Sequence, residues 1–227
     1  RALRDREETL QAQNERLERF TSVLSHDLRN PLNVASGELE LARETGDETH
    51  LETVAQAHER MAELIQDVLT LARKGKRIGE TEVIDLQTLV NGCFATVDTA
   101  SAELRVETDR QIRGDPGRLQ SLFENLFRNA VEHGGSAVTI TVGELQDGFY
   151  VADDGTGIPA ETRDSVREAG FTTAKTGTGL GVTIVAEAAE AHGWEMAITD
   201  AADGGARFEF TGVELLEPPP TYRDGQE

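Results

Sequence analysis

Leucine recurs at every seventh position near the start of the chain, among charged neighbours: Leu3, Leu10, Leu17 and Leu24. With Asn14 at a plausible seam position, this spacing predicts a parallel coiled coil, although a single amphipathic surface helix would show much the same pattern. No Gly or Pro interrupts the chain between the first of these leucines and His26. We therefore favour a coiled-coil helix over residues 1–15 that leads directly into the next segment.

The first helix is expected to run to Glu44, because the segment TGDET at 45–49 contains helix-stop and N-cap residues. A second helix is predicted to end near the segment RKGKRIGE, since apolar residues recur three or four positions apart: Leu51, Val54, Met61, Leu64, Ile65, Val68, Leu69 and Leu71. Two antiparallel helices cannot bury both apolar stripes alone. Residues 16–75 are therefore predicted to form a helical hairpin that pairs with a second copy into a dimeric four-helix bundle.

From Glu82 onward short apolar runs alternate with helical patterns. Strands are predicted at 83–85, 103–107, 137–142, 149–153, 195–200 and 206–210, and helices at 86–97, 116–133 and 179–192. The mixture predicts that residues 82–213 form an α/β sandwich, with a mixed sheet covered on one face by helices, so the whole chain is α+β. Residues 214–227, with three consecutive prolines at 218–220, are predicted to be a disordered tail.

The chain is strongly acidic, with a formal net charge of −20 from 42 acidic and 22 basic residues, of which only three are lysines. Binding to nucleic acid is not expected, because it needs a basic surface. The excess of acid, with Arg in place of Lys, is typical of proteins from halophiles, and an ordinary acidic cytosolic protein is the alternative.

No apolar run approaches the roughly 18 residues of a membrane span, so no membrane contact is expected within this chain. The single cysteine, Cys93, lies in an apolar run and is expected to be a buried, inert thiol in a reducing, cytoplasmic compartment. The chain begins with Arg and shows no signal peptide, so we expect a fragment with a sensing or anchoring part upstream.

The segment SHDLRNPL at 25–32 places His26 directly before Asp27 on the first helix. The carboxylate is near enough to accept a hydrogen bond from one ring nitrogen, which leaves the other as a free nucleophile. Pro31 lacks the N–H that would bond to the carbonyl of Asp27, so a bend is expected one turn after the histidine. A solvated His–Asp pair on a helix surface is the alternative.

Three further motifs follow. Asn125 and Asn129, in ENLFRNA, share one face of a predicted helix, and their amide oxygens suit Mg²⁺ that already carries a triphosphate; surface hydrogen-bonding is the alternative. In DDGTGIP, Asp153 ends a strand and could accept the adenine amine, while Gly155 and Gly157 allow close backbone approach; an ordinary Asp–Gly turn is the alternative. The third motif, GTGLG at 177–181, opens a helix whose first amides would face phosphates.

The order and spacing of these four motifs resemble the catalytic core of sensor histidine kinases of two-component systems, over roughly residues 16–212. The resemblance implies that His26 is the phosphoacceptor and Asp27 its activating carboxylate. By the same resemblance, Asn30 orients water for dephosphorylation of the partner regulator.

The resemblance also implies a nucleotide site for ATP and Mg²⁺, with Asn129 as the metal ligand. Its cofactor-binding residues would be Asn125, Asn129, His133, Asp153, Gly155, Gly157, Lys175, Gly177, Thr178, Gly179, Leu180 and Gly181. Residues 160–176 resemble a mobile lid over ATP, although Val166 stands where a Phe is usual. Glu132 stands where many members have a phosphate-contacting Lys, so phosphate charge has to be neutralised partly from elsewhere.

The expected function is that of an ATP-dependent protein histidine kinase, a homodimer that autophosphorylates His26 and passes the phosphoryl group to an Asp of a response regulator. One alternative is an ATPase clamp of the gyrase and MutL type, which uses a Glu at the position of Asn125. The other is a dimeric signalling scaffold that binds nucleotide without transfer, and the intact His, Asn and Gly motifs argue against it.

Overall fold

The computed structural model describes residues 24–25, 27–72, 79–97, 101–135, 137–167 and 179–218. The chain divides into two compact units, residues 1–73 and 74–227. The predicted coiled coil over residues 1–15 lies outside the described residues, and so does His26.

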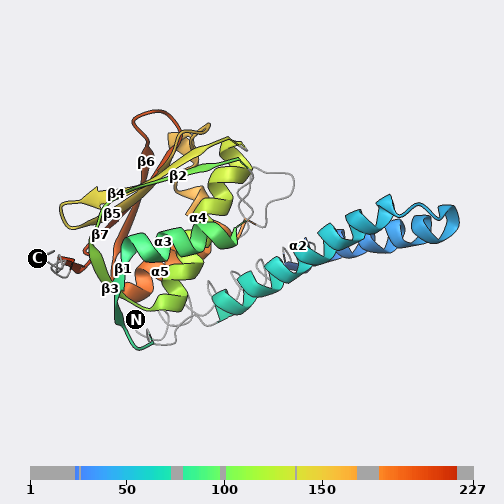
Figure 1. Cartoon of the computed structure of the whole chain (residues 1–227), viewed down its shortest axis with the longest axis horizontal. Coiled ribbons are helices and arrows are strands. Elements are labelled where there is room, and N and C mark those ends of the chain that lie inside the picture. The colour runs from blue at the N-terminus through green and yellow to red at the C-terminus, as the bar shows by residue number, and fades with distance from the viewer. Residues whose placement is uncertain are drawn as a thin grey trace, which may run out of the picture. The chain divides into compact units, whose positions relative to one another are not determined.

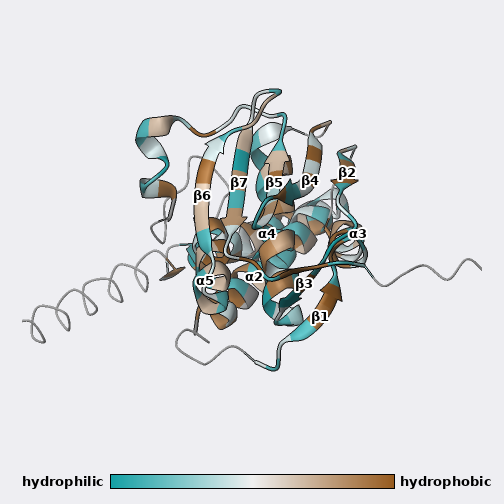
Figure 2. Ribbon diagram, turned by 90° about the vertical axis from the view of Figure 1, so that its left-hand side faces the viewer, coloured by the Kyte–Doolittle hydropathy of each residue, from teal (hydrophilic) through white to brown (hydrophobic). Residues whose placement is uncertain are grey.

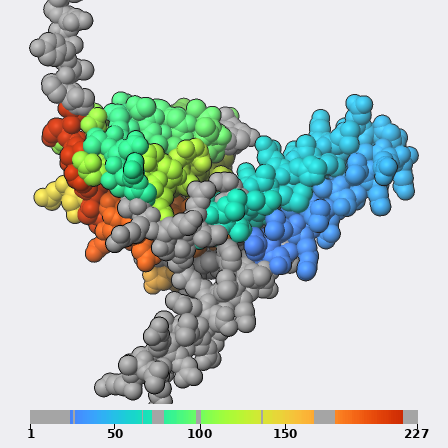
Figure 3. Space-filling model, turned by 90° about the horizontal axis from the view of Figure 1, so that it is seen from below, coloured from blue at the N-terminus to red at the C-terminus, as the bar shows by residue number. Residues whose placement is uncertain are grey.

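The first unit is a helical hairpin. Residues 27–45 are helical, with the pattern continuing through Pro31, and the second helix, α2, spans Thr49–Ala72. The two helices run antiparallel, side by side, in both views (Figures 1 and 3). Asp47 accepts hydrogen bonds from the backbone N–H (2.9 Å) and hydroxyl (2.8 Å) of Thr49. The helix break therefore falls within the predicted segment 45–49.

Large apolar side chains of this hairpin stay exposed within the single chain. Small and apolar residues between the helices are buried: Ala35, Ala57, Leu64 and Leu71. Seven large apolar side chains remain between 42% and 52% exposed: Leu32, Val34, Leu39, Leu41, Leu51, Ile65 and Leu69. A contact between Nδ1 of His50 and Oε2 of Glu38, 2.6 Å apart, joins the two helices. The apolar stripes are thus only partly buried, as the sequence analysis expected.

The second unit is built on a five-stranded mixed sheet in the order β2-β4-β5-β7-β6 (Figure 2). Its strands are β2 Glu103–Glu107, β4 Thr139–Leu145, β5 Gly148–Asp153, β6 Glu195–Asp200 and β7 Ala206–Thr211. β2 pairs with β4 in parallel, and the other neighbours are antiparallel. The register places Asp153, the last residue of β5, opposite Ile140.

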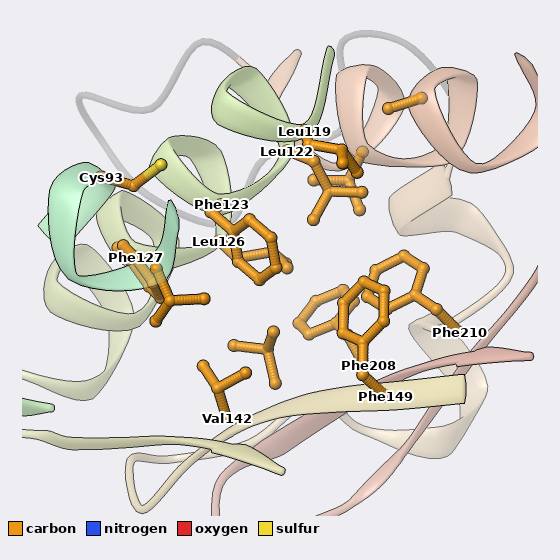
Figure 4. Packing of buried hydrophobic residues seen from close by; sticks show 14 of the residues in the cluster. Cys93, Leu119, Leu122, Phe123, Leu126, Phe127, Val142, Phe149, Phe208 and Phe210 are labelled. Atoms are coloured by element: carbon orange, nitrogen blue, oxygen red, sulfur yellow. The ribbon is translucent and has the colours of Figure 1, made fainter. Parts of the chain in front are cut away.

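Three helices cover one face of this sheet: α3 Leu86–Thr96, α4 Pro116–Gly134 and α5 Gly181–His192. Phe123 of α4 packs on Phe149 of the sheet, with ring centroids 5.6 Å apart, and Phe127 packs on Phe123 at 6.0 Å; these three rings and Phe210 are fully buried (Figure 4). The rings of Phe149 and Phe210 stack with centroids 4.8 Å apart. The predicted sandwich is therefore confirmed, and its core lies between the helices and the sheet.

A second, three-stranded sheet was not predicted. It joins β1 Glu82–Asp85, β3 Gln111–Gly114 and β8 Leu215–Leu216 in the order β1-β3-β8, all antiparallel. The prediction that residues 214–227 form a disordered tail was therefore wrong for its first residues, since β8 pairs with β3. An ion pair between Nε of Arg113 in β3 and Oε2 of Glu214, 3.1 Å apart, adds a side-chain contact between β3 and the residue before β8. Residues 219–227 lie outside the described residues.

Candidate functional site

The helix α4 carries the two asparagines that the sequence analysis singled out. Asp115 caps its N-terminus by accepting hydrogen bonds from the backbone N–H of Gly117 (3.0 Å) and Arg118 (3.2 Å), and Pro116 occupies the first turn, where no N–H is needed. Asn125 is buried, with 6% of its surface exposed, and its Nδ2 donates to the carbonyl of Ser121 at 2.8 Å. The Oδ1 of Asn125 therefore has a fixed direction.

Both amides meet the first residue of α5. A Cβ atom built onto Gly181 would lie 3.1 Å from Oδ1 of Asn129 and 3.2 Å from Oδ1 of Asn125. Such separations are tighter than about nine in ten real Cβ contacts, so a larger residue at 181 would require the two amides to shift by a few tenths of an ångström. The structure thus brings three predicted site residues from two helices together.

The start of α5 has the backbone features of an anion-binding helix N-terminus. Gly179 has φ +65°, a conformation that favours glycine, and Leu180 is buried. No side chain of the described residues caps this end. The positive end of a helix dipole favours a negatively charged group at such an N-terminus. Thr183, in the same turn, is only 3% exposed, and its hydroxyl has no hydrogen-bond partner in the part of the chain that the structure describes.

The two aspartates at the end of β5 have different surroundings. Oδ1 of Asp153 accepts hydrogen bonds from the backbone N–H of Gly155 (2.9 Å) and Ala206 (3.2 Å). Burial nevertheless raises the pKa of Asp153 above its usual value, and these two bonds only partly oppose that shift. Asp154 accepts from the backbone N–H of Thr139 at 2.8 Å, and this bond lowers its pKa. Asp153 is therefore the more buried of the two carboxylates.

The loop after β5 lies against the end of α4. A Cβ on Gly155 would lie 2.4 Å from the Cα of Gly134, and the hydroxyl of Thr156 donates to the carbonyl of His133 at 3.3 Å. Gly157 has φ +73°, and a Cβ there would lie 3.0 Å from the carbonyl oxygen of Gly205. The glycines of DDGTGIP are therefore required by close backbone contacts, and the exposed side chain of His133 stands beside this loop.

The first part of the predicted lid is ordered by Arg163. Two short 3₁₀ turns, η1 Ala160–Thr162 and η2 Ser165–Arg167, follow the loop. Nε of Arg163 donates to the carbonyl of Ile158 at 3.0 Å, and its guanidinium pairs with Asp200 at the end of β6. Residues 168–178 lie outside the described residues, and three predicted site residues, Lys175, Gly177 and Thr178, fall in that segment.

In the hairpin, Asp27 is half-buried and Asn30 is exposed, both on the first helix. The predicted bend at Pro31 stays a prediction, as does the pairing of Asp27 with His26.

Several residues that position the site residues through backbone contacts were not predicted from the sequence. Ser121 fixes Asn125, Ala206 binds Asp153, and Gly205 has φ +81° with a Cβ position only 2.1 Å from the carbonyl oxygen of Asp153. Gly204 and Gly205 before a strand were a turn signal, but nothing local linked this turn to a strand end 50 residues earlier.

Two family models match the chain. One, described as the His Kinase A (phospho-acceptor) domain, matches residues 16–77, and the other, described as the histidine kinase-, DNA gyrase B- and HSP90-like ATPase, matches residues 114–215.

Individual relatives agree with these matches. The sensor histidine kinase ZraS of Escherichia coli K12 is 29% identical over 230 residues, covering 92% of this chain and 49% of the relative. The chain thus spans about half the length of these curated relatives. The histidine kinase AdeS of Acinetobacter baumannii has a similar fold, with a TM-score of 0.62 at 20% identity over 82% of this chain and 97% of that structure. Full-length ShkA in complex with AMPPNP reaches a TM-score of 0.58 at 28% identity, over 88% of this chain and 47% of that structure.

Proposed function

The chain belongs to the sensor histidine kinases of two-component systems, and on that premise we propose that it uses ATP to phosphorylate its own His26. The family model over residues 114–215 supports the use of ATP. The observation that carries the proposal is the meeting of the Asn125 and Asn129 amides with Gly181. That geometry leaves two neutral oxygens beside a helix N-terminus, where phosphate and its cation bind.

The described residues fit a nucleotide. Asp153 would accept the exocyclic amine of adenine, because its carboxylate lies at the end of β5 with only two backbone partners among the described residues. Gly155 and Gly157 would let the backbone approach the base, with His133 beside it. The amides of Gly179, Leu180 and Gly181 would face the phosphates, and Lys175, Gly177 and Thr178 belong to the same proposed site.

Asn129 is the proposed ligand of Mg²⁺, with Asn125 beside it. Among the described residues, no group of three or more His, Cys, Asp or Glu side chains could hold a metal ion by itself. Amide oxygens add no charge, so they suit a cation that arrives with a triphosphate. The cation would neutralise charge on the phosphates and help to align the reacting γ-phosphate.

The proposed chemistry begins at His26. A neutral ring nitrogen attacks the γ-phosphorus, the bond from that phosphorus to the bridging oxygen breaks, and ADP leaves with the electron pair. Asp27 would hold the N–H of the other ring nitrogen and stabilise the imidazolium that forms. The phosphoryl group then passes to an Asp carboxylate of a response regulator. Asn30, which is exposed, would orient water when the regulator is dephosphorylated.

The proposed partners are a second copy of this chain and the receiver domain of a regulator. The exposed apolar side chains of the hairpin favour its dimerisation, because pairing two hairpins into a four-helix bundle buries apolar surface. No helix in the described part of the chain has the length and apolar character needed to cross a bilayer. We place the reaction in the cytoplasm, where ATP and the regulator would be supplied.

The proposal is tested with ATP labelled at the γ-phosphate. The purified chain should retain label that is labile in acid and stable in alkali, as a phosphohistidine is, and should pass it to an added receiver domain. Release of free phosphate with no labelled protein would indicate an ATPase clamp. Binding of ATP with neither product would indicate a nucleotide-dependent scaffold.

A further inference from the structure

Glu132 creates a charge problem in the proposed nucleotide site. Its exposed side chain follows Asn129 by three residues on α4, so it lies on the same side of the helix as the amide pair. A carboxylate at that position repels a triphosphate. If the site binds ATP, as proposed above, a positive charge beyond those of Mg²⁺ and Lys175 would help to offset the phosphates and Glu132.

The arginines of the second unit are the candidates for this charge. The structure describes the side chains of seven of them. Six lie within ion-pair distance of a carboxylate: Arg105, Arg110, Arg113, Arg118, Arg163 and Arg207. The seventh, Arg128, forms no hydrogen bond or ion pair with the residues that the structure describes. In so acidic a chain, a half-buried arginine without a carboxylate partner stands out.

The helix geometry of α4 would allow Arg128 to form an ion pair with a glutamate one turn away, but neither nearby glutamate pairs with it in the described residues. Glu124 and Glu132 stand four residues before and after it, at the spacing that favours helical ion pairs. Oε1 of Glu124 is engaged elsewhere, since it accepts hydrogen bonds from Gln120 (2.8 Å) and from Thr96 of α3 (3.1 Å). Glu132 is exposed and forms no ion pair within the described residues. Within the described ranges, no carboxylate therefore competes for the guanidinium of Arg128.

The position of Arg128 on α4 fits a phosphate role. It follows Asn125 by three residues and precedes Asn129 directly, and both amides face Gly181 at the start of α5. A guanidinium presents several N–H donors in a planar fork that matches phosphate oxygens, and its long side chain can span the short distance round the helix.

We propose that Arg128 is a phosphate-binding residue of the nucleotide site and supplies the positive charge that Glu132 opposes. The inference deepens the proposed function and rests on it. The ligand is the polyphosphate of a nucleoside triphosphate, so the interaction contributes to binding of ATP and not to binding of adenosine.

The test compares Arg128→Gln with Arg113→Gln, a control whose arginine pairs with Glu214 in the small sheet. Calorimetric titration with ATP and with adenosine should show ATP affinity lowered about tenfold or more in Arg128→Gln, because a charged hydrogen bond is lost. Adenosine affinity should stay within about twofold of wild type in both variants. Wild-type affinity for ATP in Arg128→Gln would overturn the proposal, and so would an equal loss for adenosine, which would show a structural role.

A second variant tests the opposing charge. Glu132→Gln should raise ATP affinity several-fold and leave adenosine affinity unchanged, and an unchanged or lower ATP affinity would overturn the compensating role. Failure of the proposed function would look different. A wild-type chain that binds neither ATP nor adenosine would overturn both proposals, whereas normal ATP binding by wild type and by Arg128→Gln would overturn only this one.

Discussion

Asp153 and Asp154 are neighbours at the end of β5, yet their carboxylates differ in burial and in hydrogen-bond partners. Asp154 is exposed to solvent, and its hydrogen bond from the backbone N–H of Thr139 ties the loop to β4. Asp153 is partly buried, and burial raises its pKa. Burial raises the free energy of the ionised carboxylate. A ligand that donates a hydrogen bond to this carboxylate would lower that free energy.

Asp153→Asn is expected to weaken ATP binding by about ten- to a hundredfold, because a charged acceptor for the adenine amine becomes a neutral one. GTP, which has no amine at that position, should be affected less. The free protein should keep or slightly gain stability, since the amide oxygen can accept the same two backbone N–H groups without a buried charge. Competition binding and urea unfolding measure the two effects. Asp154→Asn is the control, and an unchanged ATP preference in Asp153→Asn would move adenine recognition elsewhere.

Thr183→Val should stabilise the free protein by about 1 kcal/mol. The substitution replaces a buried hydroxyl that lacks a partner with a methyl group of similar shape, so it removes a desolvation penalty without leaving a cavity. Urea unfolding monitored by tryptophan fluorescence gives the free energy of unfolding. A loss of stability of similar size would show that the hydroxyl binds a partner such as an ordered water.

The site residues could be predicted from the sequence where a motif is local. Asn125, Asn129 and Gly181 were expected to belong to one site, and the structure places them together. Their supports were not predictable in the same way. Ala206 meets Asp153 through its backbone N–H, and a backbone contact across 53 positions leaves no side-chain signature in the sequence.

At the scale of elements, the C-terminal end of α5 is fastened by His192. Its Nε2 accepts a hydrogen bond from the backbone N–H of Asp115 (2.9 Å), and its Nδ1 donates to the carbonyl of Ala188 (2.7 Å). The ring also stacks on Trp194, with centroids 4.3 Å apart. The neutral tautomer therefore joins α5 to the start of α4. Burial lowers the pKa of His192 from its ordinary value of 6.5, and the hydrogen bond to Ala188 and the charge of Asp115 oppose this shift.

The stability of the second unit should therefore depend on pH. In the unfolded chain His192 takes up a proton below about pH 6.5, whereas the folded chain resists protonation, because Nε2 would lose its role as acceptor. The stabilisation is fully present above that pH and declines as pH falls toward the lowered pKa. Asp115 and Arg118 are the charged groups that act on the ring.

Urea unfolding at pH 7.5, 6.5 and 5.5 measures this effect. His192→Gln should be less stable at pH 7.5 and should show a flatter dependence between pH 7.5 and 5.5 than wild type. An identical slope in both proteins would assign the pH dependence to other groups.

The main helices and six of the eight strands in the described residues followed from periodicity, and the ends of these strands lie at or within three residues of the predicted ones. β3 and β8 did not. β8 contains only Leu215 and Leu216, and its identity as a strand comes from pairing with Gln111 and Ile112 more than 100 residues earlier. A two-residue segment cannot show the alternation of apolar and polar residues that marks a strand. The prolines at 218–220 then favoured its interpretation as part of a tail.

At the scale of the whole molecule, charge is the dominant feature. With a net charge of −20, the chain repels itself, and ATP has to approach a surface of its own sign. Screening should help both folding and nucleotide entry. If the acid excess reflects adaptation to salt, autophosphorylation and the thermal midpoint should both rise between about 0.1 M and molar KCl. A midpoint that stays level or falls would reject the halophile interpretation and leave the kinase proposal untouched.

The most direct measurement of the central claim compares wild type with His26→Gln after incubation with γ-labelled ATP. Wild type should retain acid-labile phosphate, and His26→Gln should retain none. Both should bind ATP with the same affinity, because the acceptor and the nucleotide site lie in different units of the chain. Acid-labile label on His26→Gln would contradict the assignment of His26 as the phosphoacceptor.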